Sequence, residues 1–179
     1  MFPNKYSWLL DETGPRILKE FLNVFGTQEK IGNDSNPTIL WWARSIGLHD
    51  TYVSDSIPWC GLAMAYVAAQ AGWDHNPRGN ALYARNWLAW GTPVAIGDEM
   101  LGDVLVFTRP GGGHVGLYVG EDSSHFHVLG GNQSNAVSIK RIVKGRLITG
   151  RRCPWRVNQP SNVRKVYLSP SGEESADEA

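Results

Sequence analysis

Cysteine, charge and long apolar runs are all scarce in this chain. Only Cys60 and Cys153 are cysteines among 179 residues, too few for a disulfide framework or a structural zinc site. Charged residues make up 19% of the chain and the formal net charge is zero, which argues against a nucleic-acid-binding surface. No run approaches the roughly 18 apolar residues of a transmembrane helix, so we predict no membrane insertion.

Residues 1–10 also lack the basic region, apolar core and small-residue cleavage site of a Sec-type signal peptide. We therefore expect synthesis in the cytoplasm. An external target would be reached only after release, injection or virion delivery.

Hydrophobic residues nevertheless make up 42% of the chain, which includes 20 glycines and eight tryptophans. This share is sufficient for a hydrophobic core, and the length suits one domain. We predict that residues 1–157 form that domain. Residues 158–179 are polar and contain four acidic side chains near their end, so we predict a disordered acidic tail.

Helical patterns occupy the first half of the chain, and short β-branched or aromatic runs occupy the second. The order predicts an α+β fold with N-terminal helices packed on a C-terminal antiparallel sheet. Tryptophans 41, 42, 87 and 90 fall at helical spacings, where core packing is the favoured interpretation. The predicted helices are 15–25, 37–46, 59–71 and 81–90, and the predicted strands are 103–107, 114–119, 125–129, 137–142 and 147–152.

Cys60 stands where a polar loop becomes an apolar helix. A helix N-terminus carries unpaired N–H groups and a partial positive charge, which lower a thiol pKa and favour the nucleophilic thiolate. The alternative is a small, inert core residue, which is the usual role of a free cysteine.

His114 follows three glycines and opens an apolar strand. Glycines give access to the imidazole and a strand holds it rigidly, as a general base for a cysteine nucleophile requires. The alternative is a water-exposed histidine at a strand edge. After the next strand, Gly130 and Gly131 leave the backbone open before Asn132, whose amide is placed to orient His114. A plain Gly-Gly-Asn turn would look the same.

Taken together, these segments resemble the CHAP and NlpC/P60 superfamily of cysteine peptidoglycan hydrolases, and most closely a small subgroup of phages and bacteria. The motifs are Ile57–Cys60, Gly102–Phe107, Gly113–Tyr118 and Val128–Val137, within a similarity that extends over about Gly26–Trp155.

The resemblance implies a papain-like fold with Cys60 as the nucleophile and His114 as the base. Many family members place a Glu and an Asn near the end of the next strand. Here Gly130 stands at the Glu position and only Asn132 matches, which implies a Cys-His-Asn arrangement. Some members bind calcium ahead of the cysteine, but Asp55 and its neighbours form no acidic cluster, so we expect no metal and no cofactor.

The implied activity is that of a cysteine amidase or endopeptidase, of the N-acetylmuramoyl-L-alanine amidase or D,L-endopeptidase type. The enzyme would cleave a stem-peptide amide of bacterial peptidoglycan through a thioester, as a monomeric phage lysin. We expect Trp59 to form a wall of the substrate groove and Tyr52 to be a candidate second oxyanion donor, with Gly113 and Gln133 also near the substrate.

Two other functions fit the same segments. An inactive wall- or glycan-binding module would use the fold and its tryptophans without chemistry, and a structural component of a phage tail or virion is compatible with activity. The presence of both Cys60 and His114 favours the enzyme, because a binder needs no such pair.

Overall fold

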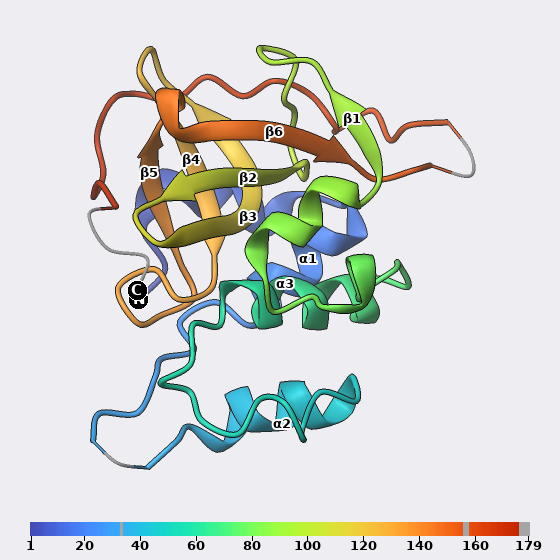
Figure 1. Ribbon diagram of the computed structural model, residues 1–179. Helices are drawn as coiled ribbons and strands as arrows, with labels where there is room; N and C mark the ends of the chain where they lie inside the picture. The colour runs from blue at the N-terminus through green and yellow to red at the C-terminus, as the bar shows by residue number, and fades with distance from the viewer. Residues whose placement is uncertain (33, 156–157, 176–179) are drawn as a thin grey trace.

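The α-helices of this protein precede its sheet along the chain and cover one side of it (Figure 1). The computed structural model describes residues 1–32, 34–155 and 158–175. No helix in these ranges is long and apolar enough to cross a membrane. The helical elements are the 3₁₀ helix η1 (Asn4–Asp11), α1 (Arg16–Asn23), α2 (Pro37–Ser45), α3 (Cys60–Gln70), and the 3₁₀ helices η2 (Pro77–Gly79) and η3 (Ala84–Ala89).

The sheet is antiparallel and has the strand order β1-β6-β2-β3-β4-β5. Its strands are β1 (Thr92–Val94), β2 (Val104–Arg109), β3 (Gly112–Glu121), β4 (His125–Gly130), β5 (Ser138–Val143) and β6 (Leu147–Arg152), with the 3₁₀ helix η4 (Lys144–Arg146) before β6. The α+β class and the antiparallel sheet predicted from sequence are therefore confirmed. The short strand β1 was not predicted, because Pro93 at its centre is untypical of a strand.

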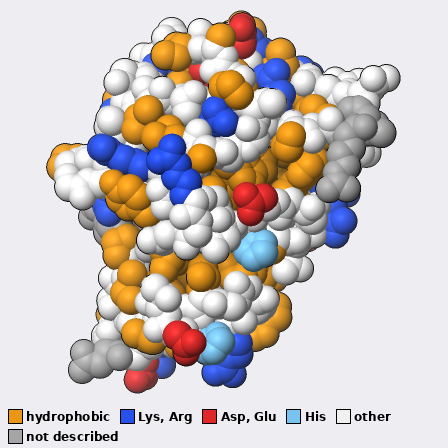
Figure 2. Space-filling view, turned by 45° about the vertical axis from the view of Figure 1, so that its right-hand side comes forward, with side chains coloured by type: hydrophobic (Ala, Val, Ile, Leu, Met, Phe, Trp, Pro, Cys, Tyr) orange, Lys and Arg blue, Asp and Glu red, His pale blue; other side chains and the backbone are white. Residues whose placement is uncertain are grey.

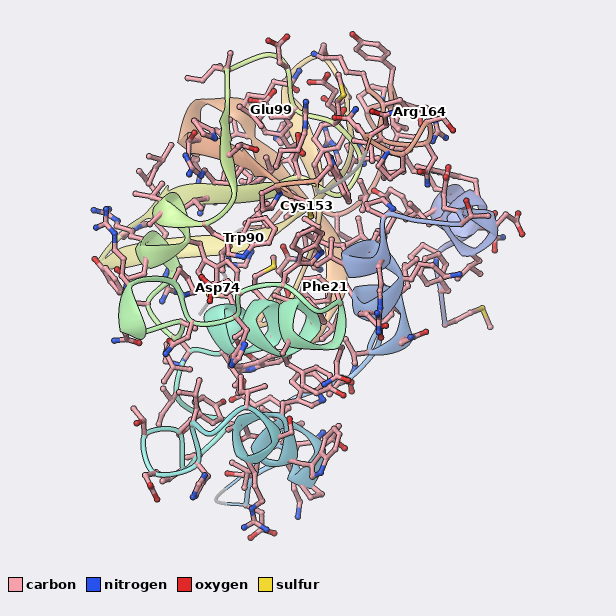
Figure 3. All side chains as sticks on the ribbon, turned by 90° about the vertical axis from the view of Figure 1, so that its right-hand side faces the viewer. Phe21, Asp74, Trp90, Glu99, Cys153 and Arg164 are labelled. Carbon is pink, nitrogen blue, oxygen red and sulfur yellow. The ribbon has the colours of Figure 1, made fainter. Side chains whose placement is uncertain are left out.

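Helix α3 is the central helix: it lies between the sheet and α2, and α1 packs beside it (Figure 1). It is apolar on nearly every face, as a helix covered on both sides must be. Figure 3 shows Phe21, Trp90 and Cys153 in the interior between these helices and the sheet, and all three belong to one core cluster.

The loops before α3 are fixed by two polar side chains. Asn36 caps α2 by accepting a hydrogen bond from the Thr38 backbone N–H at 2.8 Å, as the sequence predicts. The buried carboxylate of Asp55 accepts from the backbone N–H groups of Lys30 at 2.9 Å and Asn36 at 2.7 Å. Asp55 thus joins the loop that leads to Cys60 to the loop that leads to α2.

Residues 158–175 do not form the disordered tail that their composition predicted. The backbone of Glu121 at the end of β3 donates to Val166 and accepts from Leu168, both at 2.8 Å. Farther along, Arg141 on the edge strand β5 donates its backbone N–H to the Glu173 carbonyl at 2.9 Å. This segment covers backbone groups at the end of β3 and on the edge strand β5, a tertiary contact that composition cannot reveal. The acidic residues 177 and 178 lie outside the described residues.

A buried polar network occupies the end of β4 that lies away from Gly130. His127 Nδ1 is hydrogen-bonded to the Tyr6 hydroxyl at 2.6 Å, and His127 Nε2 lies 3.1 Å from the Asp122 carboxylate. Burial, assisted by the charge of Lys5, lowers the pKa of His127 to about 4, although Asp122 opposes this shift. The network therefore favours a neutral His127.

This shift predicts that the protein loses stability as the pH falls from about 6.5 to about 4. In that window the unfolded chain binds a proton at residue 127 and the folded chain does not, which removes up to roughly 3 kcal/mol. Urea unfolding at several pH values measures the slope. His127→Gln should flatten it, whereas the exposed-site control His49→Gln should keep it; equal slopes for His127→Gln and the wild type would contradict the assignment.

Candidate active site

Cys60 is the first residue of α3, at the point where helix N–H groups have no partner within the helix. The backbone N–H groups of Val115, Gly61 and Cys60 itself lower the pKa of its thiol, against the effect of burial. Gly61 allows a close approach here, because a Cβ at this position would collide with the backbone carbonyls of Ala81 and Leu82. The small residue after Cys60 therefore lets the segment 80–84 pack directly against the start of the helix.

His114 lies on β3 immediately before Val115, and its side chain is fully buried. Helix α3 packs against β3, and the backbone N–H of Val115 is among the groups that lower the pKa of the Cys60 thiol against the effect of burial. The structure therefore brings together the two segments that the sequence paired, 54 positions apart along the chain.

Gln133 holds the imidazole ring: its Oε1 lies 3.1 Å from His114 Nε2. The same amide donates through Nε2 to the backbone carbonyls of Val128 at 3.2 Å and Ser138 at 2.7 Å. Because both donor bonds go to carbonyl oxygens, Oε1 is the acceptor that faces His114, and His114 Nε2 carries the proton. Nδ1 is then the basic nitrogen of the neutral ring.

The sequence assigned the orienting role to Asn132 and substrate contact to Gln133. The hydrogen bond at His114 Nε2 favours Gln133 for the orienting role. Asn132 is buried with φ of +58°, in the left-handed region. This turn conformation places the next residue, Gln133, against the His114 ring. The sequence signal was only that two amides stand side by side after two glycines.

Cys60 opens into a cleft of about 290 Å³. The thiol residue is only 3% exposed, so the cleft is its contact with solvent. Gly113 lines the cleft, as do two residues that the sequence did not single out, Arg109 and Tyr83, the latter 49% exposed. The other lining residues are Ile57, Pro58, Asn80, Leu82, Ala84, Gly111 and Gly112.

Trp59 is fully buried, which contradicts its predicted role as a groove wall. Its indole Nε1 donates to the Glu29 carboxylate at 3.3 Å, and its ring packs near Trp42 in the core. The exposed aromatic ring of the cleft belongs to Tyr83 instead. Helix periodicity does not tell whether Trp59 faces the cleft or the core, because a residue at the start of a helix can face either of them.

Tyr52 is also buried, and its hydroxyl donates to the Ile57 carbonyl at 3.2 Å. Burial raises the pKa of Tyr52, so the phenol stays protonated. Its ring lines a separate groove beside α2 and not the Cys60 cleft. Tyr52 therefore supports the loop that precedes Cys60, and this hydrogen bond does not direct the hydroxyl to the sulfur.

Burial raises the pKa of the Cys60 thiol, whereas the sequence predicted a lowered value. The N–H of Val115, the charge of Arg109 and the N–H groups at the helix start all act in the opposite direction, and burial exceeds them. The thiol is therefore neutral at neutral pH until a base removes its proton. Among the described residues, no group of three or more His, Cys, Asp or Glu side chains is arranged to hold a metal ion.

Comparisons with known proteins give no family assignment. No protein-family model matches the chain, and no curated protein sequence matches it significantly. The geometry of the site is therefore the main evidence for function.

Proposed function

We propose that this chain is a cysteine hydrolase with a papain-like fold that cleaves an amide bond in the stem peptide of bacterial peptidoglycan. The observation that carries the proposal is the junction of α3 and β3. Cys60 begins α3 and lines a cleft, the backbone N–H of Val115 on β3 is among the groups that lower the pKa of its thiol against the effect of burial, and the neighbouring His114 is held by Gln133. An inert core cysteine needs no such surroundings.

In the first step, His114 takes the thiol proton on Nδ1 while the Cys60 sulfur attacks the amide carbonyl carbon. A C–S bond forms, and N–H groups at the start of α3, including that of Cys60, stabilise the oxyanion. The C–N bond then breaks and His114 gives its proton to the leaving amine. Water, deprotonated by His114, finally cleaves the thioester and restores the thiol.

The choice of peptidoglycan rests on the sequence motifs around Cys60 and His114 and on the chemistry of the cleft. Stem peptides are short and carry free carboxylates. Tyr83 and Leu82 offer apolar contact to such a peptide, and the positive charge of Arg109 suits its carboxylates. A monomeric phage lysin that reaches the wall after release is the role in keeping with these motifs.

A second candidate is a non-catalytic module that binds the wall. The near-complete burial of Cys60 and the raised pKa of its thiol favour this candidate, because both reduce the reactivity of sulfur. The two functions differ in one observable. A module would sediment with sacculi and release nothing, whereas the hydrolase releases fragments.

Digestion of purified sacculi tests the proposal. Mass spectrometry of the soluble products should show stem-peptide fragments with one new amine and one new carboxylate per cleavage, and their masses identify the bond. Sacculi of two cross-link types should be compared, because the cleft chemistry alone does not select the peptide. Absence of released fragments from both would reject the hydrolase.

Gln133→Ala should lower kcat by about 10- to 100-fold, because His114 loses the hydrogen bond that fixes its tautomer and orientation. Asn132→Ala should have a smaller effect than either Gln133→Ala or His114→Ala. Steady-state kinetics across pH should show an altered profile for Gln133→Ala, which a merely structural change would not produce. Thermal unfolding of both variants monitors folding, and a larger loss for Asn132→Ala would restore Asn132 to the orienting role.

A further inference from the structure

A second groove, of about 500 Å³, lies between α2 and the loop 48–58. Its volume falls within the roughly 300–1,000 Å³ typical of small-molecule sites. One side consists of Pro37, Leu40, Trp41 and Arg44, whose spacing of three and four residues places them on one face of α2. The mechanism proposed for Cys60 makes no use of this groove.

Trp41 gives the groove an exposed aromatic surface. Its side chain is 53% exposed, so it departs from the prediction of core packing, which Trp42, Trp87 and Trp90 follow. Tyr66 supports the Trp41 ring edge to face, with 5.7 Å between ring centroids. Because the Trp41 ring contacts Tyr66 and remains exposed to solvent, it is suited to stacking on a flat ligand.

Two side chains that can donate hydrogen bonds also line the groove. Arg44 stands three residues after Trp41 on the same helix face, and His49 lines the opposite side of the groove. Within the described part of the chain, Arg44 makes no side-chain hydrogen bond or ion pair, so its guanidinium donors are available. In Figure 2, hydrophobic, basic, acidic and histidine side chains all reach the surface of the lower part of the molecule, where α2 lies in Figure 1.

The groove is connected to the Cys60 cleft through one short loop. Tyr52 and Val53 line the groove, and Ile57 and Pro58 line the cleft. The Tyr52 hydroxyl, which donates to the Ile57 carbonyl at 3.2 Å, ties the two ends of this loop together. A ligand that occupies both sites would therefore cross the surface of the loop 52–58.

We propose that the groove binds the amino-sugar chain that carries the stem peptide, with the apolar face of a pyranose ring on Trp41. Arg44 then donates hydrogen bonds to acetamido, hydroxyl or carboxylate oxygens of the same saccharide unit. The assignment of the sugar rests on the proposed function, because a stem peptide in the Cys60 cleft is covalently attached to such a chain. An isolated peptide has no flat, C–H-rich face of this kind.

The direct test measures binding of chitotetraose, a soluble β-1,4 N-acetylglucosamine oligomer, by calorimetry. The Cys60→Ala protein removes any complication from hydrolysis. We expect saturable binding that Trp41→Ala weakens at least tenfold in this background and that Trp41→Phe weakens less. The control is Tyr167→Ala, an exposed aromatic residue (75%) outside the groove, which should bind as the parent does. No binding by the parent, or equal binding after Trp41→Ala, would overturn the inference.

A kinetic test separates this inference from the proposed function. The otherwise wild-type enzyme is assayed on a disaccharide-peptide and on the same peptide without sugar. Trp41→Ala should lower the ratio of the two kcat/KM values about tenfold, and Tyr167→Ala should leave it unchanged. An unchanged ratio for Trp41→Ala overturns the sugar site while hydrolysis stands. Trp41-dependent chitotetraose binding without cleavage of either substrate supports the sugar site and rejects the hydrolase.

Discussion

Replacing Cys60 with alanine is expected to abolish stem-peptide hydrolysis, with a loss of roughly 10⁴-fold or more in kcat. The reason is chemical: without the sulfur no thioester forms, and the remaining N–H groups can only polarise the carbonyl. The fold should survive, because alanine is smaller than cysteine and suits the apolar helix α3. Release of muropeptides from sacculi, followed by mass spectrometry, measures the loss.

The chain provides a matched control in its other cysteine. Cys153 is also buried and free, and burial raises the pKa of its thiol to about 12. It does not line the Cys60 cleft. Cys153→Ala should therefore retain activity and lose at most a modest amount of stability. Comparable loss of activity in the Cys60 and Cys153 variants would indicate a folding effect and contradict the role of Cys60.

Replacing His114 is expected to have the second largest effect, a loss of about 10³-fold in kcat at neutral pH. Because burial raises the pKa of the Cys60 thiol, little thiolate exists at neutral pH unless a neighbouring base takes the proton. The His114→Ala variant should recover part of its rate as the pH rises, since hydroxide then deprotonates the sulfur. The pH dependence of kcat measures this recovery.

Alkylation of Cys60 by iodoacetamide gives an independent readout of the same effect. At neutral pH His114→Ala should slow the alkylation, and the two proteins should converge at alkaline pH. His127→Gln is a suitable control, because His127 is equally buried but belongs to the network with Tyr6 and Asp122. Unchanged alkylation in His114→Ala would exclude His114 as the base.

Much of the fold was predictable because its signals are local. Asn36 before Pro37 marks the start of α2, and short β-branched and aromatic runs mark β2 to β6. Cys60 and His114 could be singled out because Cys60 stands where a loop becomes an apolar helix and His114 follows three glycines at the beginning of an apolar run. How near the two side chains lie, however, depends on how α3 packs against β3, which no local pattern specifies.

The missed features depend on backbone direction and tertiary contacts. Gln133 makes a hydrogen bond at His114 Nε2, whereas the sequence singled out its neighbour Asn132, a turn residue with positive φ. The face that α2 presents to α3 decides that Trp42 is buried while Trp41 is exposed. Likewise, the order of residues 158–175 comes from contacts with β3 and β5 far away in the sequence.

The central claim is that the Cys60 sulfur carries the acyl group during hydrolysis, and trapping that intermediate tests it most directly. The enzyme is mixed with a stem-peptide substrate, quenched in acid within milliseconds, and mapped by mass spectrometry. We predict an added mass equal to the acyl half of the substrate on the peptide that contains Cys60, and its absence in Cys60→Ala. Substrate turnover with the added mass on another residue, or at the wild-type rate in Cys60→Ala, would contradict the claim.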